Sequence, residues 1–259
     1  MKKGTISDMP HTVIITGASS GIGAATAKLL SQKGYNMALC ARREEKLNEV
    51  AETCRKEGVQ VFSQVVDVTD KGQREKFFNE TLRTFNKIDV LFNNAGLALG
   101  IDHYKETKTE NLRIMFETNV FASFECTKLV LPHMIERQSG HLVFMGSVAG
   151  HQSYEGGSVY CASKHAQRAM IESLRQEISE HPIRITSLDP GAVETEFSIV
   201  RLGSKDAASK VYAGFTPLTA NDIAECVYFA LSRPSHVNIA QMNIFPVHQA
   251  DARKISKKE

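Results

Sequence analysis

The sequence predicts an α/β protein, a single-domain doubly wound parallel sheet (Rossmann fold) of about seven strands with helices on both faces. Three observations predict it. Short aliphatic runs alternate with longer amphipathic stretches, a glycine-rich turn follows the first run, and no linker or repeat interrupts the alternation before about residue 190. Continuous apolar strands separated by helices are typical of a parallel sheet covered on both faces, and right-handed crossovers wind it doubly. We expect residues 1–259 to form this one domain.

The elements follow one another in a regular order. Strands are expected at 12–16, 35–41, 59–68, 88–94, 140–147, 183–190 and 239–245, and helices at 22–34, 43–58, 74–85, inside 110–137, at 158–180 and at 221–232. Residues 191–220 lose the pattern, so we expect a loop with short helices there. A long irregular insertion in a compact domain is often a binding loop, which makes 191–220 the candidate substrate-loop segment; the alternative is a tolerated surface excursion.

Composition excludes several classes of protein. The 259 residues are 42% hydrophobic, and 31 basic against 29 acidic residues leave a net charge of +2. That balance favours neither nucleic acid nor membrane as a partner. The five cysteines are scattered without a CxxC pair, and the nine histidines show no metal-ligand spacing, so we expect reduced thiols and no metal. The amino terminus lacks an apolar signal core, which makes a cytoplasmic protein the expectation.

The glycine-rich turn, TGASSGIG, lies between the first expected strand and the first expected helix. Gly17, Gly21 and Gly23 allow a tight turn and let backbone N–H groups approach a pyrophosphate. The helix amino terminus then presents its positive end to the anion. In this strand–turn–helix context the pattern predicts a nucleotide site, and the alternative is a flexible loop.

The end of the second expected strand favours NADP(H) over NAD(H). Folds that prefer NAD place an acid there to bind the ribose 2′-hydroxyl, but this chain has Ala41 followed by Arg42 and Arg43. Guanidinium groups suit a 2′-phosphate, and Ser19 and Ser20 could add hydroxyl donors. The alternative is that the two arginines pair with the two glutamates that follow them.

The third and fourth expected strands also end in candidate cofactor residues. Asp67 is placed to meet the adenine edge, beside the backbone of Val68. The fourth strand ends in NNAG, which contains Asn94, Ala95 and Gly96. Small residues at a carboxyl strand end suit the wall of the crevice in which open α/β sheets bind ligands.

Tyr160 and Lys164 are four residues apart in SVYCASKHA and would share one face of a helix. A cation close to a phenol lowers the pKa of the phenol, so the pair could be an acid/base device. On spacing alone, a tyrosine beside a solvated lysine is the simpler reading.

With these residues in hand, the chain resembles the short-chain dehydrogenase/reductase family over essentially its whole length. The motifs that carry the resemblance are TGASSGIG at 16–23, NNAG at 93–96, Asn119 in ETNV, Ser147 in FMGS, YCASK at 160–164, and PG at 190–191 followed by VETEF at 193–197. Each motif alone is weak, whereas all of them in order at family spacing make the resemblance specific.

The resemblance implies a catalytic set of Asn119, Ser147, Tyr160 and Lys164. Tyr160 would be the general acid/base, Lys164 would lower its pKa and bind the nicotinamide ribose, Ser147 would hold the substrate oxygen, and Asn119 would keep a water linking Lys164 to solvent. Taken singly, Ser147 reads as a strand-end cap and Asn119 as a satisfied amide. Cys161 has no evident base and reads as a packing residue.

The pattern and the resemblance together give the expected NADP(H)-binding residues. They are Gly17, Ser19, Ser20, Gly21, Ile22, Gly23, Arg42, Arg43, Asp67, Val68, Asn94, Ala95, Gly96, Tyr160, Lys164, Pro190, Gly191, Val193 and Thr195.

Segments 94–100, 157–164 and 190–201 resemble a narrower group, the NADP-dependent 3-hydroxy acid dehydrogenases that act on serine or L-allo-threonine. This resemblance implies oxidation of a β-hydroxyl in a small acid, or reduction of a 3-oxo acid. Ser147 and Tyr160 would then contact the substrate, and Arg201 is the candidate for its carboxylate. A loop-surface or subunit contact is the alternative for Arg201. Alternative functions are a broad carbonyl reductase and a catalytically silent NADP(H) sensor.

Oligomeric state is implied only by the resemblance. Family members commonly pair the helices that correspond here to about 112–137 and 158–180. We therefore expect a homo-oligomer, a tetramer in preference to a dimer, that acts on a small molecule.

Overall fold

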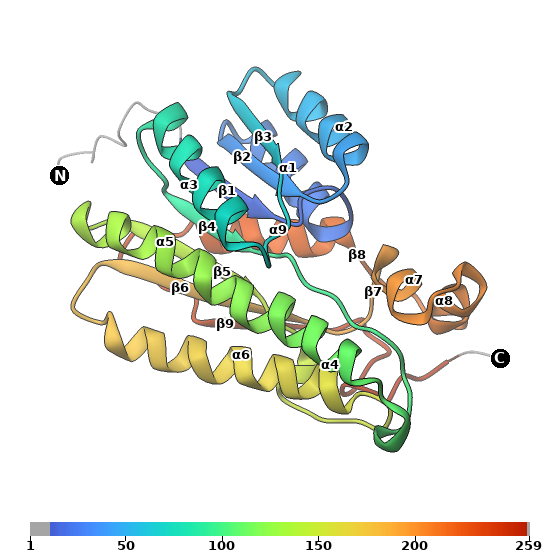
Figure 1. The fold of residues 1–259 in the computed structure, drawn as a ribbon. Coiled ribbons are helices and arrows are strands. Elements are labelled where there is room, and N and C mark those ends of the chain that lie inside the picture. Colours follow the sequence, from blue (N-terminus) through green and yellow to red (C-terminus); the bar gives the residue numbers. More distant parts are fainter. Residues whose placement is uncertain (1–10, 258–259) are drawn as a thin grey trace.

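A seven-stranded parallel sheet forms the centre of the computed structural model, which describes residues 11–257 (Figure 1). Its strands lie in the order β3-β2-β1-β4-β5-β6-β9. They span Thr12–Thr16 (β1), Asn36–Ala41 (β2), Val61–Val65 (β3), Val90–Asn93 (β4), Gly140–Met145 (β5), Ile183–Pro190 (β6) and Gln241–Ile244 (β9). The chain starts in the middle of the sheet, runs outward to β3 and returns to β4 on the other side of β1. The expected Rossmann fold is confirmed, with its switch point between β1 and β4.

Helices cover both faces of the sheet. They are α1 (Gly21–Gln32), α2 (Glu44–Arg55), α3 (Lys71–Phe85), α4 (Thr109–Phe116), α5 (Ala122–Glu136), α6 (Ser158–Glu177) and α9 (Ala220–Leu231). Along β1, Val13 and Ile15 belong to the core shared with α1, α2 and α9, whereas Ile14 belongs to the core shared with α3, α5 and α6. Because strand side chains alternate between faces, an all-apolar strand is what a sheet buried on both sides requires.

The observed elements differ from the expected ones mainly at their ends. The expected strand at 59–68 is shorter, at Val61–Val65, and the helix expected at 43–58 ends at Arg55. The helix expected inside 110–137 is interrupted by a π-helical turn, Glu117–Phe121, between α4 and α5. One extra residue per turn shifts the side chains that follow, and such turns often occur at functional sites.

Residues 191–220 contain more regular structure than the sequence suggested. Two short helices, α7 (Glu196–Leu202) and α8 (Lys205–Tyr212), were expected in kind, but the parallel pair of β7 (Val193–Glu194) with β8 (Leu218–Thr219) was not. Hydroxyl caps at Thr195, Ser204 and Thr219 begin α7, α8 and α9. Figure 1 shows α7 and α8 standing beside the carboxyl ends of the central strands.

Within residues 11–257, no helix has the length and apolar character needed to cross a bilayer. The same residues contain no group of three or more His, Cys, Asp or Glu side chains that could hold a metal ion. The expected domain limits of 1–259 extend past the described part at both ends, and most of the amino-terminal segment behind the cytoplasmic expectation lies outside it.

Candidate active site

A large cleft of about 870 Å³ opens at the carboxyl ends of the strands. The loops after β1, β2, β3 and β4 form one half of it, which we call the cofactor half because it carries the glycine turn and the two arginines. The loops after β5 and β6, helix α7 and the carboxyl-terminal segment form the other half, which we call the substrate half. All the site residues expected from the sequence line the cleft, apart from Gly23 and Asn119. The cleft therefore lies where open α/β sheets bind ligands.

The glycine turn is shaped by close backbone approach. Gly17 and Gly21 have φ of +67° and +53°, in the left-handed region that favours glycine. A Cβ on Gly17 would lie 2.9 Å from the Ala95 Cα. A Cβ on Gly23 would lie 2.5 Å from both the Asn94 Nδ2 and the Gly17 carbonyl oxygen, which explains why Gly23 is needed although it does not line the cleft.

The amino terminus of α1 offers free backbone donors to the cleft. Ser20 occupies the N-cap position but makes no capping hydrogen bond to residues of the described chain. The first-turn N–H groups have no partner inside the helix, and Gly21 and Ile22 line the cleft. Thr16 Oγ1 accepts hydrogen bonds from the backbone N–H groups of Asn94 and Ala95, both at 3.0 Å, and so fixes the opposite wall. This arrangement suits an anion such as a pyrophosphate.

Arg43 connects the glycine turn to α7. Its guanidinium donates to Ser19 Oγ at 3.3 Å, to Ser20 Oγ, and to Glu196 Oε2 at 2.6 Å. Lys46 pairs with the other oxygen of Glu196. Hydrogen bonds from Lys46 and Arg43 lower the pKa of Glu196 to about 2. Arg43 and Lys46 together hold the start of α7 against the cofactor half of the cleft.

Arg42 pairs with the end of the third strand instead. Its Nη1 lies 4.0 Å from Asp67 Oδ2. Asp67 Oδ1 also accepts hydrogen bonds from the Thr69 N–H at 2.9 Å and the Thr69 hydroxyl at 2.7 Å. The alternative in which the arginines pair with the two glutamates after them is thus wrong for residues 11–257, where their ionic partners come from other loops.

Tyr160 and Lys164 lie one turn apart on α6, as the spacing predicted, and both are buried, with exposed fractions of 9% and 5%. The Lys164 ammonium donates to the Met145 carbonyl oxygen at 2.7 Å and to Gln167 Oε1 at 3.2 Å. Burial lowers the pKa of Lys164 to about 8, and the charge of Asp189 opposes that effect. Lys164 therefore gives up its proton more readily than an exposed lysine does.

The phenol of Tyr160 is held at the mouth of the substrate half. Burial raises its pKa well above the usual value, while a side-chain hydrogen bond with Ser147 and the charge of Arg201 act in the opposite direction. Arg201 lies over the Tyr160 ring, with its Cζ 5.5 Å from the ring centroid. The ring of Phe197 packs at 5.7 Å on Tyr160. Two groups of α7 thus contact the face of this tyrosine.

Ser147 follows β5 and has two roles. Its Oγ accepts a hydrogen bond from the Ala149 N–H at 3.1 Å and so caps the short 3-10 turn Val148–Gly150. The same side chain bonds Tyr160 and lines the cleft. The sequence left a strand-end cap and a site residue as alternatives for Ser147. Ser147 caps the 3-10 turn and also lines the cleft, so the two roles are compatible.

Asn119 lies behind the cleft, in the π-helical turn. Its Oδ1 accepts from the Leu97 N–H at 2.9 Å, and its Nδ2 donates to the Leu97 carbonyl at 2.8 Å and to Ser163 Oγ at 3.1 Å. A Cβ on Gly96 would lie 3.2 Å from Asn119 Oδ1 and 3.9 Å from the Lys164 Nζ. Asn119 therefore fastens the loop after β4 to α6, directly beside Lys164.

Arg201 is partly satisfied and partly free. Its Nε donates to the Gly100 carbonyl oxygen at 3.2 Å and its Nη1 to the Tyr154 hydroxyl at 2.9 Å. Its Nη2 is buried and has no hydrogen-bond partner within residues 11–257. A buried guanidinium donor without an acceptor is costly. Because Arg201 lines the cleft beside Tyr160, its guanidinium places a positive charge where an anionic ligand could lie.

Sequence reasoning missed several residues of the substrate half. Tyr154 anchors Arg201, and Gln249 Oε1 accepts from the Ala192 N–H at 2.8 Å. Arg253 lies 5.7 Å from the centroid of the Tyr154 ring. Tyr154 and Arg253 lie in no periodic segment or spaced motif, whereas Gln249 lies in FPVHQA at 245–250, a stretch that resembles the carboxyl end of the 3-hydroxy acid dehydrogenases but had suggested no role for this residue.

Comparison with known proteins agrees with this geometry. The family model for short chain dehydrogenases matches residues 11–202. The NADP-dependent 3-hydroxy acid dehydrogenase of Schizosaccharomyces pombe is 41% identical over 251 residues, which are 96% of this chain and 97% of the relative. Sulfoacetaldehyde reductase 2 of Chromohalobacter salexigens is 37% identical over 244 residues, covering 93% and 96% of the two chains.

A solved structure is similarly close. The closed form of serine dehydrogenase complexed with NADP+ matches with a TM-score of 0.89 and 34% identity, over 96% of this chain and 100% of the other. The fold and site define a dinucleotide-binding α/β oxidoreductase. More particularly, the chain belongs to the short-chain dehydrogenase family, and the expected resemblance to 3-hydroxy acid dehydrogenases is confirmed.

Proposed function

We propose that this protein is an NADP(H)-dependent oxidoreductase that oxidises the 3-hydroxyl of small hydroxy acids such as serine or allo-threonine, or reduces 3-oxo acids. The observation that carries the proposal is the position of Arg201. Its unpartnered Nη2 belongs to a guanidinium that lies over the ring of Tyr160. A substrate with an anionic group close to its reacting oxygen could meet both side chains at once.

NADP(H) fits the residues of the other half. The Gly17 turn leaves no room for a side chain, and the free N–H groups at the start of α1 suit the pyrophosphate. Arg43, with Ser19 and Ser20 beside it, would hold the 2′-phosphate. The names of the S. pombe relative and of the serine dehydrogenase complex support the same cofactor. When bound, the nicotinamide supplies or accepts the hydride.

The chain's own groups would manage the proton. In reduction, the Tyr160 hydroxyl donates its proton to the carbonyl oxygen, and in oxidation the phenolate removes the proton of the alcohol. Ser147 Oγ, which bonds Tyr160, would hold the same substrate oxygen as charge develops on it. Lys164 would stabilise the phenolate by its charge and bind the ribose. Asn119 would hold the water beside Lys164, next to the loop that it already fastens.

The relatives share one chemical feature in their substrates. A 3-hydroxy acid and sulfoacetaldehyde each carry an anionic group on the carbon next to the one that bears the reacting oxygen. The anion and the oxygen are thus separated by a similar short span in both. One cation beside Tyr160 could serve either substrate class, which supports an acid as the substrate here.

Replacing Tyr160 with Phe tests the mechanism. We expect the wild-type enzyme to reduce NADP+ with L-serine, L-allo-threonine or other 3-hydroxy acids, followed by the nicotinamide absorbance. Tyr160→Phe should lower kcat by about 10²- to 10⁴-fold, because the proton transfer is lost. NADPH affinity, measured by fluorescence, should stay within about twofold of the wild-type value.

Three outcomes separate the alternatives. Hydride transfer at the parent rate in Tyr160→Phe would overturn the proposed mechanism. Faster turnover of neutral ketones than of acids would favour a broad carbonyl reductase. Tight NADPH binding without turnover of any substrate would favour an NADP(H) sensor, although Ser147, Tyr160 and Lys164 are all present.

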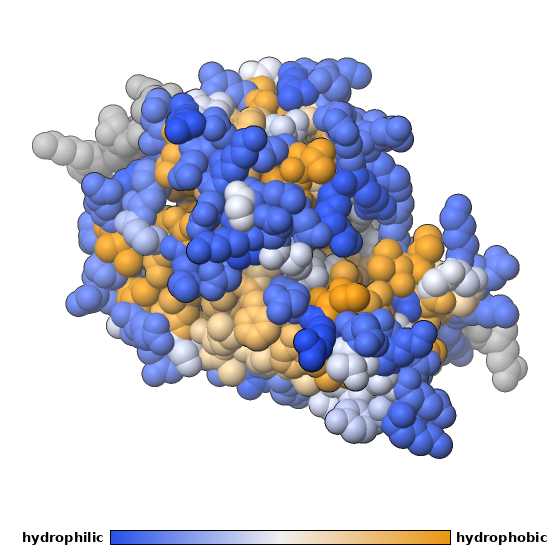
Figure 2. All heavy atoms as spheres, in the orientation of Figure 1, coloured by the Kyte–Doolittle hydropathy of each residue, from blue (hydrophilic) through white to orange (hydrophobic). Residues whose placement is uncertain are grey.

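We also propose a homo-oligomer, a tetramer in preference to a dimer, in the cytoplasm. The helices of the expected interface expose large apolar residues, namely Leu112 and Ile114 of α4, Phe121 of the π-helical turn and Met170 of α6. Figure 2 shows an apolar band on the face formed by α4 and α5. All five cysteines are free thiols, which suits a reducing compartment.

A further inference from the structure

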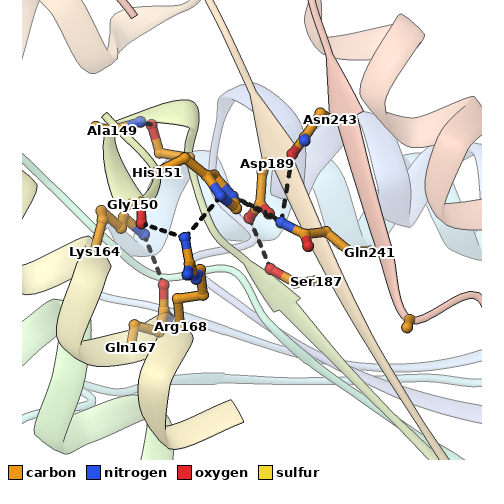
Figure 3. Close-up of polar contacts among 12 residues, drawn as sticks. Ala149, Gly150, His151, Lys164, Gln167, Arg168, Ser187, Asp189, Gln241 and Asn243 are labelled. Atoms are coloured by element: carbon orange, nitrogen blue, oxygen red, sulfur yellow. Dashed lines mark hydrogen bonds and ion pairs between the residues drawn. The ribbon is translucent and has the colours of Figure 1, made fainter. Parts of the chain in front are cut away.

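A buried polar cluster lies near Lys164, between α6, β6 and β9 (Figure 3). Its centre is Asp189, the residue before the Pro190–Gly191 pair, which is 2% exposed. Asp189 Oδ1 accepts from the Ser187 hydroxyl at 2.7 Å, and Oδ2 lies 2.9 Å from His151 Nε2 and also accepts from the Gln241 amide. Both oxygens of the buried carboxylate therefore have polar partners.

His151 joins Arg168 to Asp189. Arg168 Nη1 lies 2.9 Å from His151 Nδ1, and a guanidinium can only donate. His151 Nε2 lies 2.9 Å from Asp189 Oδ2 and 2.7 Å from the Gln241 amide nitrogen. Arg168 is itself held by the Gly150 carbonyl and by Glu172. Arg168 and His151 therefore fix the position of the carboxylate from the side of α6.

The position of Asp189 relates it to Lys164. Met145, whose carbonyl accepts from the Lys164 ammonium, is followed by Gly146. A Cβ on Gly146 would lie 1.8 Å from Asp189 Oδ1, so the carboxylate rests against the bare Gly146 backbone. Asp189 is therefore close enough for its charge to act on Lys164, yet no direct ion pair forms between them in the described chain.

This separation keeps the lysine available to the cleft. The Lys164 ammonium uses two N–H groups on Met145 and Gln167, and the third has no acceptor within residues 11–257. A direct salt bridge would draw the ammonium away from the cleft. The charged or titratable groups that face Asp189 are Lys164 and Arg168 from α6 and His151 after the 3-10 turn, whereas β9 contributes only the amides of Gln241 and Asn243.

We propose that Asp189 is the buried counter-ion of Lys164, positioned by His151 and Arg168, and that it keeps the lysine charged while the enzyme works. Asp189 and its partners are positioning residues, since they do not line the cleft. The proposal rests on the role proposed above for Lys164, but it concerns residues outside the catalytic and cofactor sets.

Asp189→Asn tests this by its pH profile, because it removes the charge and keeps the shape. Lys164 already titrates at about 8. Without the carboxylate its pKa falls further, so the alkaline limb of kcat for hydroxy acid oxidation should move about one unit toward acid. Ser187→Ala is the matched control, since it removes one hydrogen bond from the same carboxylate but no charge. Its limb should stay within about 0.3 units of the wild type. A variant profile that superimposes on the wild type would overturn the proposal.

A second measurement does not depend on turnover. It can therefore test the counter-ion role of Asp189 even if the proposed enzymatic function is wrong. The pKa of Lys164 is about 8 in the fold, below the ordinary lysine value of 10.5. The unfolded chain therefore binds the extra proton between these values, and the free energy of unfolding rises with pH there. In Asp189→Asn the rise in the free energy of unfolding should begin at lower pH. Between about pH 7 and 8 the urea midpoint should therefore increase more steeply with pH in the variant than in the wild type.

Adding Lys164→Met should abolish that difference, because the titrating group is gone. If Asp189→Asn alone does not fold, the double variant with Lys164→Met should regain a cooperative urea transition, since no unpaired charge remains buried. Equal slopes in wild type and Asp189→Asn, or a double variant that stays unfolded, would contradict the counter-ion role.

Discussion

The two halves of the cleft are built in different ways. The cofactor half comes from four turns, each directly after a parallel strand, and each turn carries a short motif. The substrate half brings together Tyr154, helix α7 and Gln249 of the carboxyl-terminal segment, which are far apart in the sequence. The first half needs only the regular sheet to be assembled, whereas the second depends on irregular segments packing on one another.

The halves also differ in how their arginines are satisfied. Arg43 already has Ser19, Ser20 and Glu196 as partners, so a phosphate that binds it must exchange for one of them. Arg201 has a buried donor with no partner within residues 11–257, and no carboxylate of these residues pairs with its guanidinium, so its charge is left for a ligand. A ligand should therefore gain more from Arg201 than from Arg43.

The largest effect should follow Arg201→Met. We expect KM for serine and other 3-hydroxy acids to rise by about 100-fold, because a charge-assisted hydrogen bond contributes about 1.5 to 3 kcal/mol. Reduction of a small neutral ketone should change by less than about threefold. Steady-state kinetics on both substrate types measures the contrast.

Arg201→Lys is the matched control for charge. It keeps the cation but cannot hold Gly100 and Tyr154 while also offering a free N–H, so its KM should lie between those of the wild type and the Met variant. If Arg201→Met weakens acids and neutral ketones equally, the arginine is not an anion site and the contrast between the two halves fails.

The cofactor half could largely be predicted from the sequence, because its residues are local to strand ends. Gly17, Arg43 and Asp67 all line the cleft as expected. The exceptions have physical reasons. Gly23 packs the helix against the loop after β4, and Asn119 is drawn inward by a π-helical turn that no spacing rule indicated.

The substrate half and the cluster behind it could be predicted only in part. Arg201 was expected because an acid needs a cation, but its anchor Tyr154 was not, since their contact joins segments 47 residues apart. Asp189 was passed over because it sits beside the Pro–Gly motif rather than in it. Apart from Ser187 on the same strand, its partners are His151 after the 3-10 turn and Gln241 of β9, and only the folded chain brings them together.

A smaller effect is expected for Arg43→Ala. The value of kcat/KM for NADP+ should fall by about 10- to 30-fold, because the 2′-phosphate loses a guanidinium that it had shared with Glu196. The value for NAD+ should change by less than about twofold.

Arg42→Ala is the matched control. Since Arg42 is well exposed and contacts Asp67 only at 4.0 Å, its loss should cost less than about fivefold with NADP+. Equal losses with both cofactors in Arg43→Ala would assign Arg43 to holding the fold.

The smallest effect should come from Glu196→Gln, and its sign is the informative part. Glu196 occupies Arg43 and Lys46 beside the expected phosphate position, so removing its charge should tighten NADPH binding by about threefold. Its pKa of about 2 lies below the ordinary glutamate value of 4.5, so the ion pairs stabilise the fold fully above pH 4.5 and are lost only as the pH falls toward 2. Glu196 therefore keeps one charge state throughout fluorescence titrations between about pH 6 and 9, and wild type and variant are compared at the same pH. Weaker NADPH binding in the variant would mean that Glu196 helps α7 to close on the cofactor. The Glu196 carboxylate would then orient Arg43 toward the phosphate and would not compete with the phosphate for it.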